Sequence, residues 1–132
     1  MFERQSSCVG DSWCHAMFKI KYCHKVFSFE EVRIFVRDLF YQISASYNMP
    51  IKKMGFDDDH VHIYLNIRLK SKPEAAKIFK GITAKLLFAK FPWVKNQFFW
   101  GSGFWNPAYL MDNIGRDESV IENYVASQRY SA

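Results

Sequence analysis

The sequence predicts an α+β domain in which an antiparallel sheet carries helices on one face. Three observations lead to this fold class. Apolar and polar residues alternate strictly over residues 60–69, which is the period of a strand with one face in a core. Two stretches, at 28–47 and 71–91, repeat apolar residues at helical spacing. The resulting order β-α-β-β-α-β-α predicts a ferredoxin-like (RRM-like) sandwich with an additional C-terminal helix.

The first predicted strand and helix follow from local patterns. Residues 13–22 alternate, with one face expected to consist of Ala16, Phe18, Ile20 and Tyr22. Ser28-Phe29-Glu30-Glu31 has the pattern of a capping box and is expected to open a helix that runs to about Tyr47. Asn48-Met49-Pro50 then ends this helix.

The remaining elements are predicted in the same way. Residues 51–56 and 60–69 form a strand pair joined by an acidic turn. A second capping box, Ser71-Lys72-Pro73-Glu74, opens a helix that Phe91-Pro92 ends. A turn rich in glycine and aromatic residues precedes a final strand at 108–114, and the last helix begins at Gly115.

Composition places limits on the kind of protein. A chain of 132 residues corresponds to one domain, expected here at residues 13–132 after a loose tail at 1–12. Apolar runs are shorter than the ~18 residues that span a bilayer, and the N-terminus lacks a signal pattern, so a cytoplasmic location is expected. The net charge of +5 fits either a partner of polyanions or a merely basic soluble protein. Three cysteines without Cys-x-x-Cys spacing are expected to be free thiols.

Two histidines on one strand are the first candidate site residues. His60 and His62 alternate with core-facing residues, so their side chains stand side by side on the polar face, next to the acidic run at 57–59. Two imidazoles in this arrangement are a plausible half of a divalent-metal site. For the pair taken alone, two partly exposed histidines on a sheet is the favoured interpretation.

The last helix adds a second candidate group. Tyr124 and Gln128 are one turn apart, so they project from the same side. A tyrosine on an amphipathic helix usually belongs to a core or an interface, but the apolar stripe here is better formed without it, by Val120, Ile121 and Val125. A glutamine oxygen can complete the shell of a hard cation held by two imidazoles, with the phenol facing the same ion.

Together these features resemble a known enzyme family. The chain is similar to the HUH single-tyrosine transposases of bacterial and archaeal insertion sequences, and among them to the small IS200/IS605 kind. The segments that carry the resemblance, in order, are Phe18-Lys19-Ile20-Lys21-Tyr22, Gly55-Phe56-Asp57-Asp58-Asp59-His60-Val61-His62-Ile63, the aromatic turn at 99–109 and Asn123-Tyr124-Val125-Ala126-Ser127-Gln128. It departs from the family at Tyr22-Cys23-His24-Lys25, where family members usually have a more basic segment.

The resemblance implies an activity and a site. His60, His62 and Gln128 would hold a divalent ion, Mg²⁺ or Mn²⁺, and Tyr124 would be the nucleophile. The implied reaction cleaves and rejoins single-stranded DNA at insertion-sequence ends through a 5′-phosphotyrosine intermediate. The family also recognises hairpins near the element ends and forms homodimers in which the tyrosine helix can complete the partner's site. A prokaryotic cytosolic protein associated with the nucleoid is therefore expected.

Basic and aromatic residues supply candidate contacts to DNA. The basic candidates lie on predicted strands, at strand ends or next to the last helix, and are Lys19, Lys21, Lys52, Lys53, Arg68 and Arg116. Phe104 and Trp105 either stack on unpaired bases or, as the favoured alternative, pack in the core.

Other functions share parts of this pattern. A replication initiator or relaxase would have the histidine pair and a tyrosine helix, usually with further domains, whereas this chain ends at Ala132. A non-catalytic module that binds single-stranded nucleic acid would need exposed stacking aromatics but no tyrosine beside a histidine pair. A metal-dependent phosphoesterase would use the histidines without a covalent step.

Overall fold

The predicted order of elements is confirmed over the part of the chain that can be described. The computed structural model describes residues 12–99, 101, 103–113 and 129–131. Its helices and strands are β1 (Trp13–Ile20), α2 (Glu30–Ser46), β2 (Ile51–Asp57), β3 (His60–Asn66), α3 (Lys72–Lys90), α4 (Pro92–Val94), β4 (Trp105–Asn113) and β5 (Tyr130–Ser131). Short 3₁₀ turns at Lys21–Cys23 and Val26–Ser28 and a π-turn at Lys95–Phe99 connect them. The predicted C-terminal helix lies outside the described residues.

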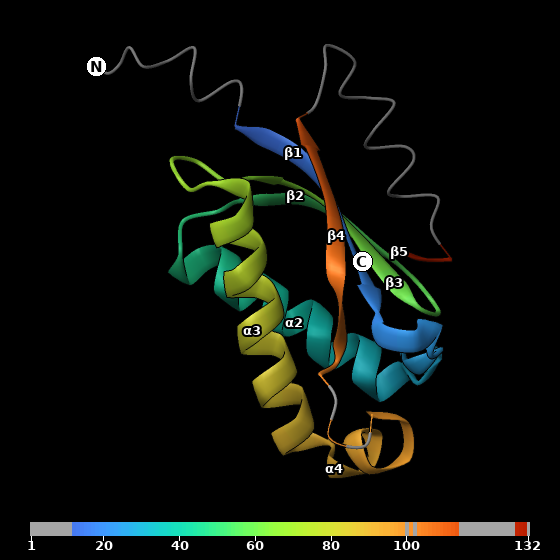
Figure 1. Cartoon of the computed structure of the whole chain (residues 1–132). Coiled ribbons are helices and arrows are strands. Elements are labelled where there is room, and N and C mark those ends of the chain that lie inside the picture. The colour runs from blue at the N-terminus through green and yellow to red at the C-terminus, as the bar shows by residue number, and fades with distance from the viewer. Residues whose placement is uncertain (1–11, 100, 102, 114–128, 132) are drawn as a thin grey trace, which may run out of the picture.

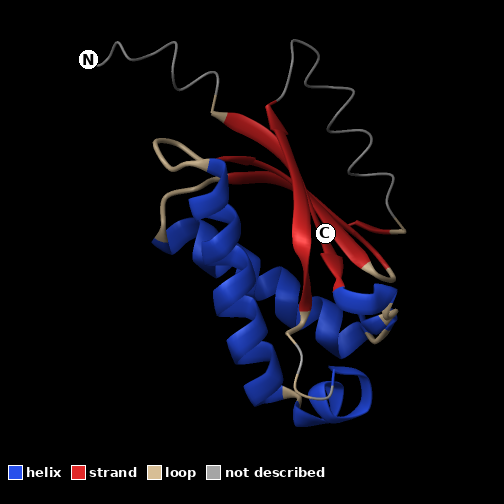
Figure 2. Cartoon of the chain, viewed as in Figure 1, coloured by secondary structure: helices blue, strands red, loops and turns tan. Residues whose placement is uncertain are grey.

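The strands form one antiparallel sheet with helices on one side. The strand order is β4-β1-β3-β2-β5, and every neighbouring pair is antiparallel. Helices α2 and α3 both lie against the same face of this sheet (Figures 1 and 2). The predicted α+β, ferredoxin-like class is therefore confirmed, and β5 is a short addition at the β2 edge. Strands β1 and β3 occupy the centre, where both edges of each strand are paired.

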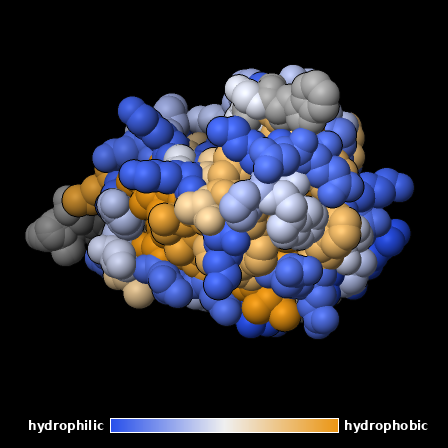
Figure 3. Space-filling view, turned by 90° about the horizontal axis from the view of Figure 1, so that it is seen from below, coloured by the Kyte–Doolittle hydropathy of each residue, from blue (hydrophilic) through white to orange (hydrophobic). Residues whose placement is uncertain are grey.

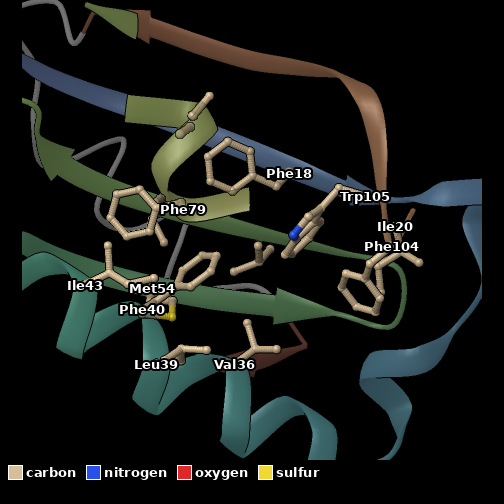
Figure 4. Close-up of a cluster of buried hydrophobic side chains, with 14 of the residues drawn as sticks. Phe18, Ile20, Val36, Leu39, Phe40, Ile43, Met54, Phe79, Phe104 and Trp105 are labelled. Carbon is tan, nitrogen blue, oxygen red and sulfur yellow. The ribbon is translucent and has the colours of Figure 1, made fainter. Parts of the chain in front are cut away.

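An aromatic core joins the sheet to the two long helices. Phe18 of β1 packs against Phe40 of α2 and Trp105 of β4, with ring centroids 6.2 and 5.9 Å away, and Phe40 lies 5.1 Å from Phe79 of α3 (Figure 4). The Trp105 indole Nε1 donates a hydrogen bond of 2.9 Å to Thr83 Oγ1, so its polar atom is satisfied within the core. Trp105 is buried, as is its neighbour Phe104, so these side chains pack in the core and do not face bases.

Of the two serines predicted to cap helices, one does so and the other does not. Ser71 caps α3, since its Oγ accepts a hydrogen bond of 3.2 Å from the Glu74 amide. Helix α2 begins near the predicted residue, but Phe29 occupies the cap position and no side chain caps it. Ser28 belongs instead to the preceding 3₁₀ turn, where its Oγ donates to the Lys25 carbonyl at 2.6 Å. Ser28 does not cap the helix because it lies one residue before the cap position, inside the 3₁₀ turn.

Several predicted strand boundaries also change. Strand β1 ends at Ile20, because Tyr22 has a left-handed φ of 63° and its side chain is 61% exposed. Strand β3 ends at Asn66, whose Oδ1 accepts from the Arg68 amide at 2.8 Å and bends the chain away from the sheet. Leu69, predicted to face the core, is 91% exposed. Strand β4 begins at Trp105, three residues before the predicted start.

The surface, the helices and the thiols add three observations. Seen from below, hydrophobic areas lie among mostly hydrophilic residues (Figure 3). Across the described residues, each helix is too short or too polar to traverse a bilayer. Cys14 and Cys23 are free thiols, as predicted, and Cys8 lies outside the described residues.

Candidate functional site

The two candidate histidines are brought together on the central strand β3. Val61 and Ile63 belong to the core, so alternation directs His60 and His62 to the face of the sheet opposite the helices. Their ring centroids are 4.9 Å apart with planes at 80°. This face is less open than the alternating pattern predicted, because His62 is 2% exposed and the next residue on it, Tyr64, is fully buried. The interpretation as two partly exposed histidines therefore fits His60 alone.

His60 is oriented by the carboxylate that precedes it. Its Nδ1 donates a hydrogen bond of 2.7 Å to Oδ1 of Asp59. When an imidazole donates from Nδ1, its other nitrogen, Nε2, keeps a lone pair. Asp59 therefore gives His60 the tautomer that can bind a metal through Nε2, which is the usual arrangement around metal-bound histidines.

His62 has a partner on the neighbouring strand that the sequence interpretation missed. His15 of β1 has its Nε2 2.8 Å from Nδ1 of His62, and the two rings are nearly parallel, 8° apart, with centroids separated by 5.0 Å. The alternation of β1 does place His15 on the same face as its neighbours Trp13 and Met17. That it would meet His62 depends on the β1–β3 register, in which Met17 pairs with His62, and local patterns do not contain this register.

Burial and neighbouring charges keep His62 neutral. Burial, followed by His15 and His60, lowers the pKa of His62 to about 4, while Asp57 acts in the opposite direction. The pKa of His15 is also lowered by burial, and the nearby Asp112 acts against this. An imidazole must be neutral to ligate a metal, so His62 is in the required form throughout the physiological pH range.

The donor set fits half of a divalent-metal site. His60 and His62 offer two imidazole nitrogens side by side, each with Nδ1 already engaged. Within the described ranges, no group of three His, Cys, Asp or Glu residues could hold a metal by itself. A divalent ion held by these two imidazoles would need at least one further ligand. Gln128, expected to be that ligand, and Tyr124 lie outside the described residues.

The residues directly after Gln128 are attached to the turn that leads into β3. We name Arg129 and Tyr130, with their contacts to Asp58, the C-terminal latch. Arg129 forms ion pairs with Asp58 at 3.0 Å and Asp57 at 3.6 Å, and Tyr130 donates its hydroxyl to Asp58 at 3.2 Å. The guanidinium of Arg33 lies 3.7 Å from the Tyr130 ring centroid, and Tyr130 also pairs with Phe56 between β5 and β2. The latch was not predicted, because it joins residues about seventy positions apart.

The candidate DNA contacts fall into two groups. Lys19 pairs with His60 in the β1–β3 register, and Lys21 follows just after β1, so both lie at the histidine end of the sheet. Lys52 and Lys53 are exposed near the other end, where Lys52 lies 5.9 Å from the Trp13 ring centroid. Arg68 lies past the far end of β3, about 20 Å along the strand from His60. Arg116 lies outside the described residues.

Comparison with known proteins identifies the family of this chain. The family model described as "Transposase IS200 like" matches residues 8–128. The ISDra2 transposase TnpA of Deinococcus radiodurans is 29% identical over 116 residues, covering 86% of this chain and 81% of the relative.

Two solved structures have similar folds. A crystal structure of a protein assigned as a transposase from Deinococcus radiodurans R1 superposes with a TM-score of 0.71 at 26% identity, covering 89% of this chain and 91% of that one. A REP-associated tyrosine transposase bound to a REP hairpin gives a TM-score of 0.60 at 10% identity over 92% of this chain and 76% of that one, a likeness of fold. Since the family match spans residues 8–128, nearly the whole chain, this protein belongs to the IS200-like transposase family.

Proposed function

We propose that this transposase cleaves and rejoins single-stranded DNA at insertion-sequence ends through a 5′-phosphotyrosine intermediate on Tyr124. The observation that carries the proposal is the pair His60 and His62, whose rings lie side by side with both Nδ1 atoms engaged. This arrangement leaves two Nε2 atoms as neighbouring metal ligands. A structural pair of surface histidines would have no need for such an arrangement.

The chemistry assigned to each residue is simple. Tyr124 attacks the scissile phosphorus, the P–O3′ bond breaks, and the phenol proton passes to the departing 3′-oxygen. His60, His62 and Gln128 would hold Mg²⁺ or Mn²⁺, which when bound draws charge from the phosphate and orients it for in-line attack. The reverse attack by a 3′-hydroxyl rejoins strands without an external energy source, because one phosphodiester is exchanged for another.

The C-terminal latch supports the assignment of Tyr124 and Gln128. Arg129 directly follows Gln128 in the sequence and is paired to Asp58, which lies two residues before His60. The latch therefore ties the residue that follows Gln128 in the sequence to the acidic turn beside the histidine pair. The amide oxygen of Gln128 is the ligand that we assign to complete the shell of the ion.

Hairpin DNA is the proposed substrate. The relative with a similar fold is bound to a REP hairpin, and this chain carries a net charge of +5 that suits a polyanion. We assign Lys19 and Lys21 to the strand near the scissile phosphate, because they lie at the His60 end of β1. Lys52 and Lys53 are exposed farther along the sheet and would contact a more distant part of the DNA.

The working form is proposed to be a homodimer that joins through β4. Transposition needs two cleavages, and each chain has one candidate nucleophile. Strand β4 lies at the edge of the sheet, is nine residues long, and presents partly exposed Tyr109 and Leu110. A mixed dimer of Tyr124→Phe and His62→Ala chains tests whether the two sites are shared, because sharing restores one complete site.

Covalent trapping tests the activity. Single-stranded oligonucleotides copied from the DNA that flanks the gene are labelled at the 5′ or the 3′ end and incubated with the protein and Mn²⁺. A 5′-phosphotyrosine link predicts that only the 3′-labelled DNA shifts to the mass of a protein adduct on a denaturing gel. The 5′-labelled DNA should instead give a shorter free fragment.

Tyr124→Phe should form no adduct, while the control Tyr47→Phe, which changes a half-exposed tyrosine at the end of α2, should form it normally. Metal-dependent cleavage that survives in Tyr124→Phe would replace the transposase mechanism with a phosphoesterase. DNA binding without cleavage by the unaltered protein would make it a binding module.

A further inference from the structure

A third histidine lies against the proposed metal pair and comes from a different strand. His15 is on β1, between the buried core residues Cys14 and Ala16, so it faces the same side of the sheet as His60 and His62. Its Nε2 is 2.8 Å from Nδ1 of His62, and the ring planes differ by 8°. The two imidazoles are thus joined by one hydrogen bond, in which either ring could be the donor.

The place of the proton in this hydrogen bond matters for metal binding. If Nδ1–H of His62 donates to His15, then Nε2 of His62 carries no proton and its lone pair can ligate a metal. If Nε2–H of His15 donates instead, a neutral His62 carries its proton on Nε2, and that atom cannot ligate. The tautomer of His15 therefore decides whether His62 can be a ligand through Nε2.

The surroundings favour the arrangement in which His15 accepts. Asp112 of β4 is the cross-strand neighbour of His15, and its carboxylate acts electrostatically on that ring. Since Nε2 of His15 faces His62, a negative charge from the other strand favours the proton on the remaining nitrogen, Nδ1. His60 offers a parallel, because its Nδ1 donates to Asp59 and so leaves Nε2 for the metal. Both histidines of the pair would then have the same tautomer.

We infer that His15 is a positioning residue, which accepts the Nδ1–H of His62 and thereby turns the Nε2 lone pair of His62 toward a divalent ion. This role rests on the metal site of the proposed function. Strand β1 would then contribute a residue to the site, in addition to the histidines of β3 and the residues Tyr124 and Gln128.

Two variants of His15 and one matched control test this inference. His15→Leu removes the acceptor, whereas His15→Gln supplies Oε1 at about the place of Nε2. The control, His24→Leu, makes the same replacement at a half-buried histidine that packs on Phe98 with ring centroids 5.1 Å apart. All variants are first compared with the unaltered protein by thermal unfolding, so that only folded chains are used.

The first measurement is the tautomer of His62 in metal-free protein, read from long-range ¹H–¹⁵N NMR of the imidazole rings. We expect the Nδ1–H form in the unaltered protein. The second measurement is Mn²⁺ affinity by calorimetry or electron paramagnetic resonance. His15→Leu should weaken it about 10–100-fold, the usual effect of losing such a partner, while His15→Gln should recover most of the affinity and His24→Leu should keep it.

Two results would overturn the inference: an Nε2–H tautomer of His62 in the unaltered protein, or unchanged Mn²⁺ affinity in folded His15→Leu. If His15→Leu does not fold, the spectrum of the unaltered protein still decides. The proposed function fails differently. In that case the tautomer and the Mn²⁺ effect would be as expected, but no adduct would form on Tyr124.

Discussion

Individual residues of the site are arranged by hydrogen bonds at their Nδ1 atoms. Asp59 accepts from His60, and His15 lies at hydrogen-bond distance from His62. These partners hold the ring orientations before any metal or DNA arrives, so less ordering is needed when they bind. His62 is also deeply buried, at 2% exposure, and its protonation state has consequences for stability.

Stability of the metal-free protein should therefore depend on pH through His62. The pKa of His62 is about 4 in the folded chain and close to 6.5 when unfolded, so between these values the unfolded state binds more protons. The contribution of His62 is complete above pH 6.5 and is lost as the pH falls through 4. The difference between the two pKa values of His62 corresponds to about 3 kcal/mol in the free energy of unfolding.

Chemical unfolding in EDTA at pH values from 4 to 7.5 measures this contribution. His62→Gln should lose less stability than the unaltered protein as the pH falls from 6.5 to 4, because glutamine does not titrate. His24→Gln serves as a control and should follow the unaltered protein. Equal slopes for the unaltered protein and His62→Gln would show that burial does not hold His62 neutral.

At the scale of single elements, the same local sequence pattern caps one helix and does not cap the other. The pattern Ser-x-x-Glu occurs before both long helices, but only Ser71 caps its helix, while Ser28 bonds to Lys25 in a separate turn. Ser71→Ala should therefore lower the free energy of unfolding by about 1 kcal/mol, the typical value of an N-cap. Ser28→Ala should have a clearly smaller effect. Urea unfolding of both variants compares them directly, and equal losses would contradict the assigned caps.

The C-terminal latch is an element whose expected role is in the site. Arg129 is exposed, so its ion pairs should add little to overall stability. Arg129→Ala should instead slow Mn²⁺-dependent formation of the Tyr124 adduct by about tenfold, because a small displacement of reacting groups has a large effect on rate. Arg37→Ala removes a surface ion pair with Asp38 on α2 and is the matched control. Identical adduct rates for the two variants would exclude this role of the latch.

At the scale of the whole molecule, the β4 edge of the sheet is the proposed dimer contact. Leu110→Lys adds a charge on this edge strand and should give a monomer in light scattering after gel filtration. Leu86→Lys makes the same change on α3 at a residue of similar exposure, 40% compared with 42% for Leu110, and should leave the dimer intact. A dimer that persists in Leu110→Lys would show that the β4 edge is not the dimer contact.

Periodicity and local motifs in the sequence determined the order of elements and the core faces of the strands and long helices. They also determined that His60 and His62 lie side by side on one face of their strand. These features depend on neighbours within a few positions, which the sequence displays directly. The tertiary structure decided the burial of His62, the contact of His15 with His62, and the attachment of Arg129 to Asp58. Each of these joins strands or termini distant in the chain, and depends on which strands pair and in what register. A shift of one residue would reverse the face of every side chain, and no local pattern specifies that register across the sheet.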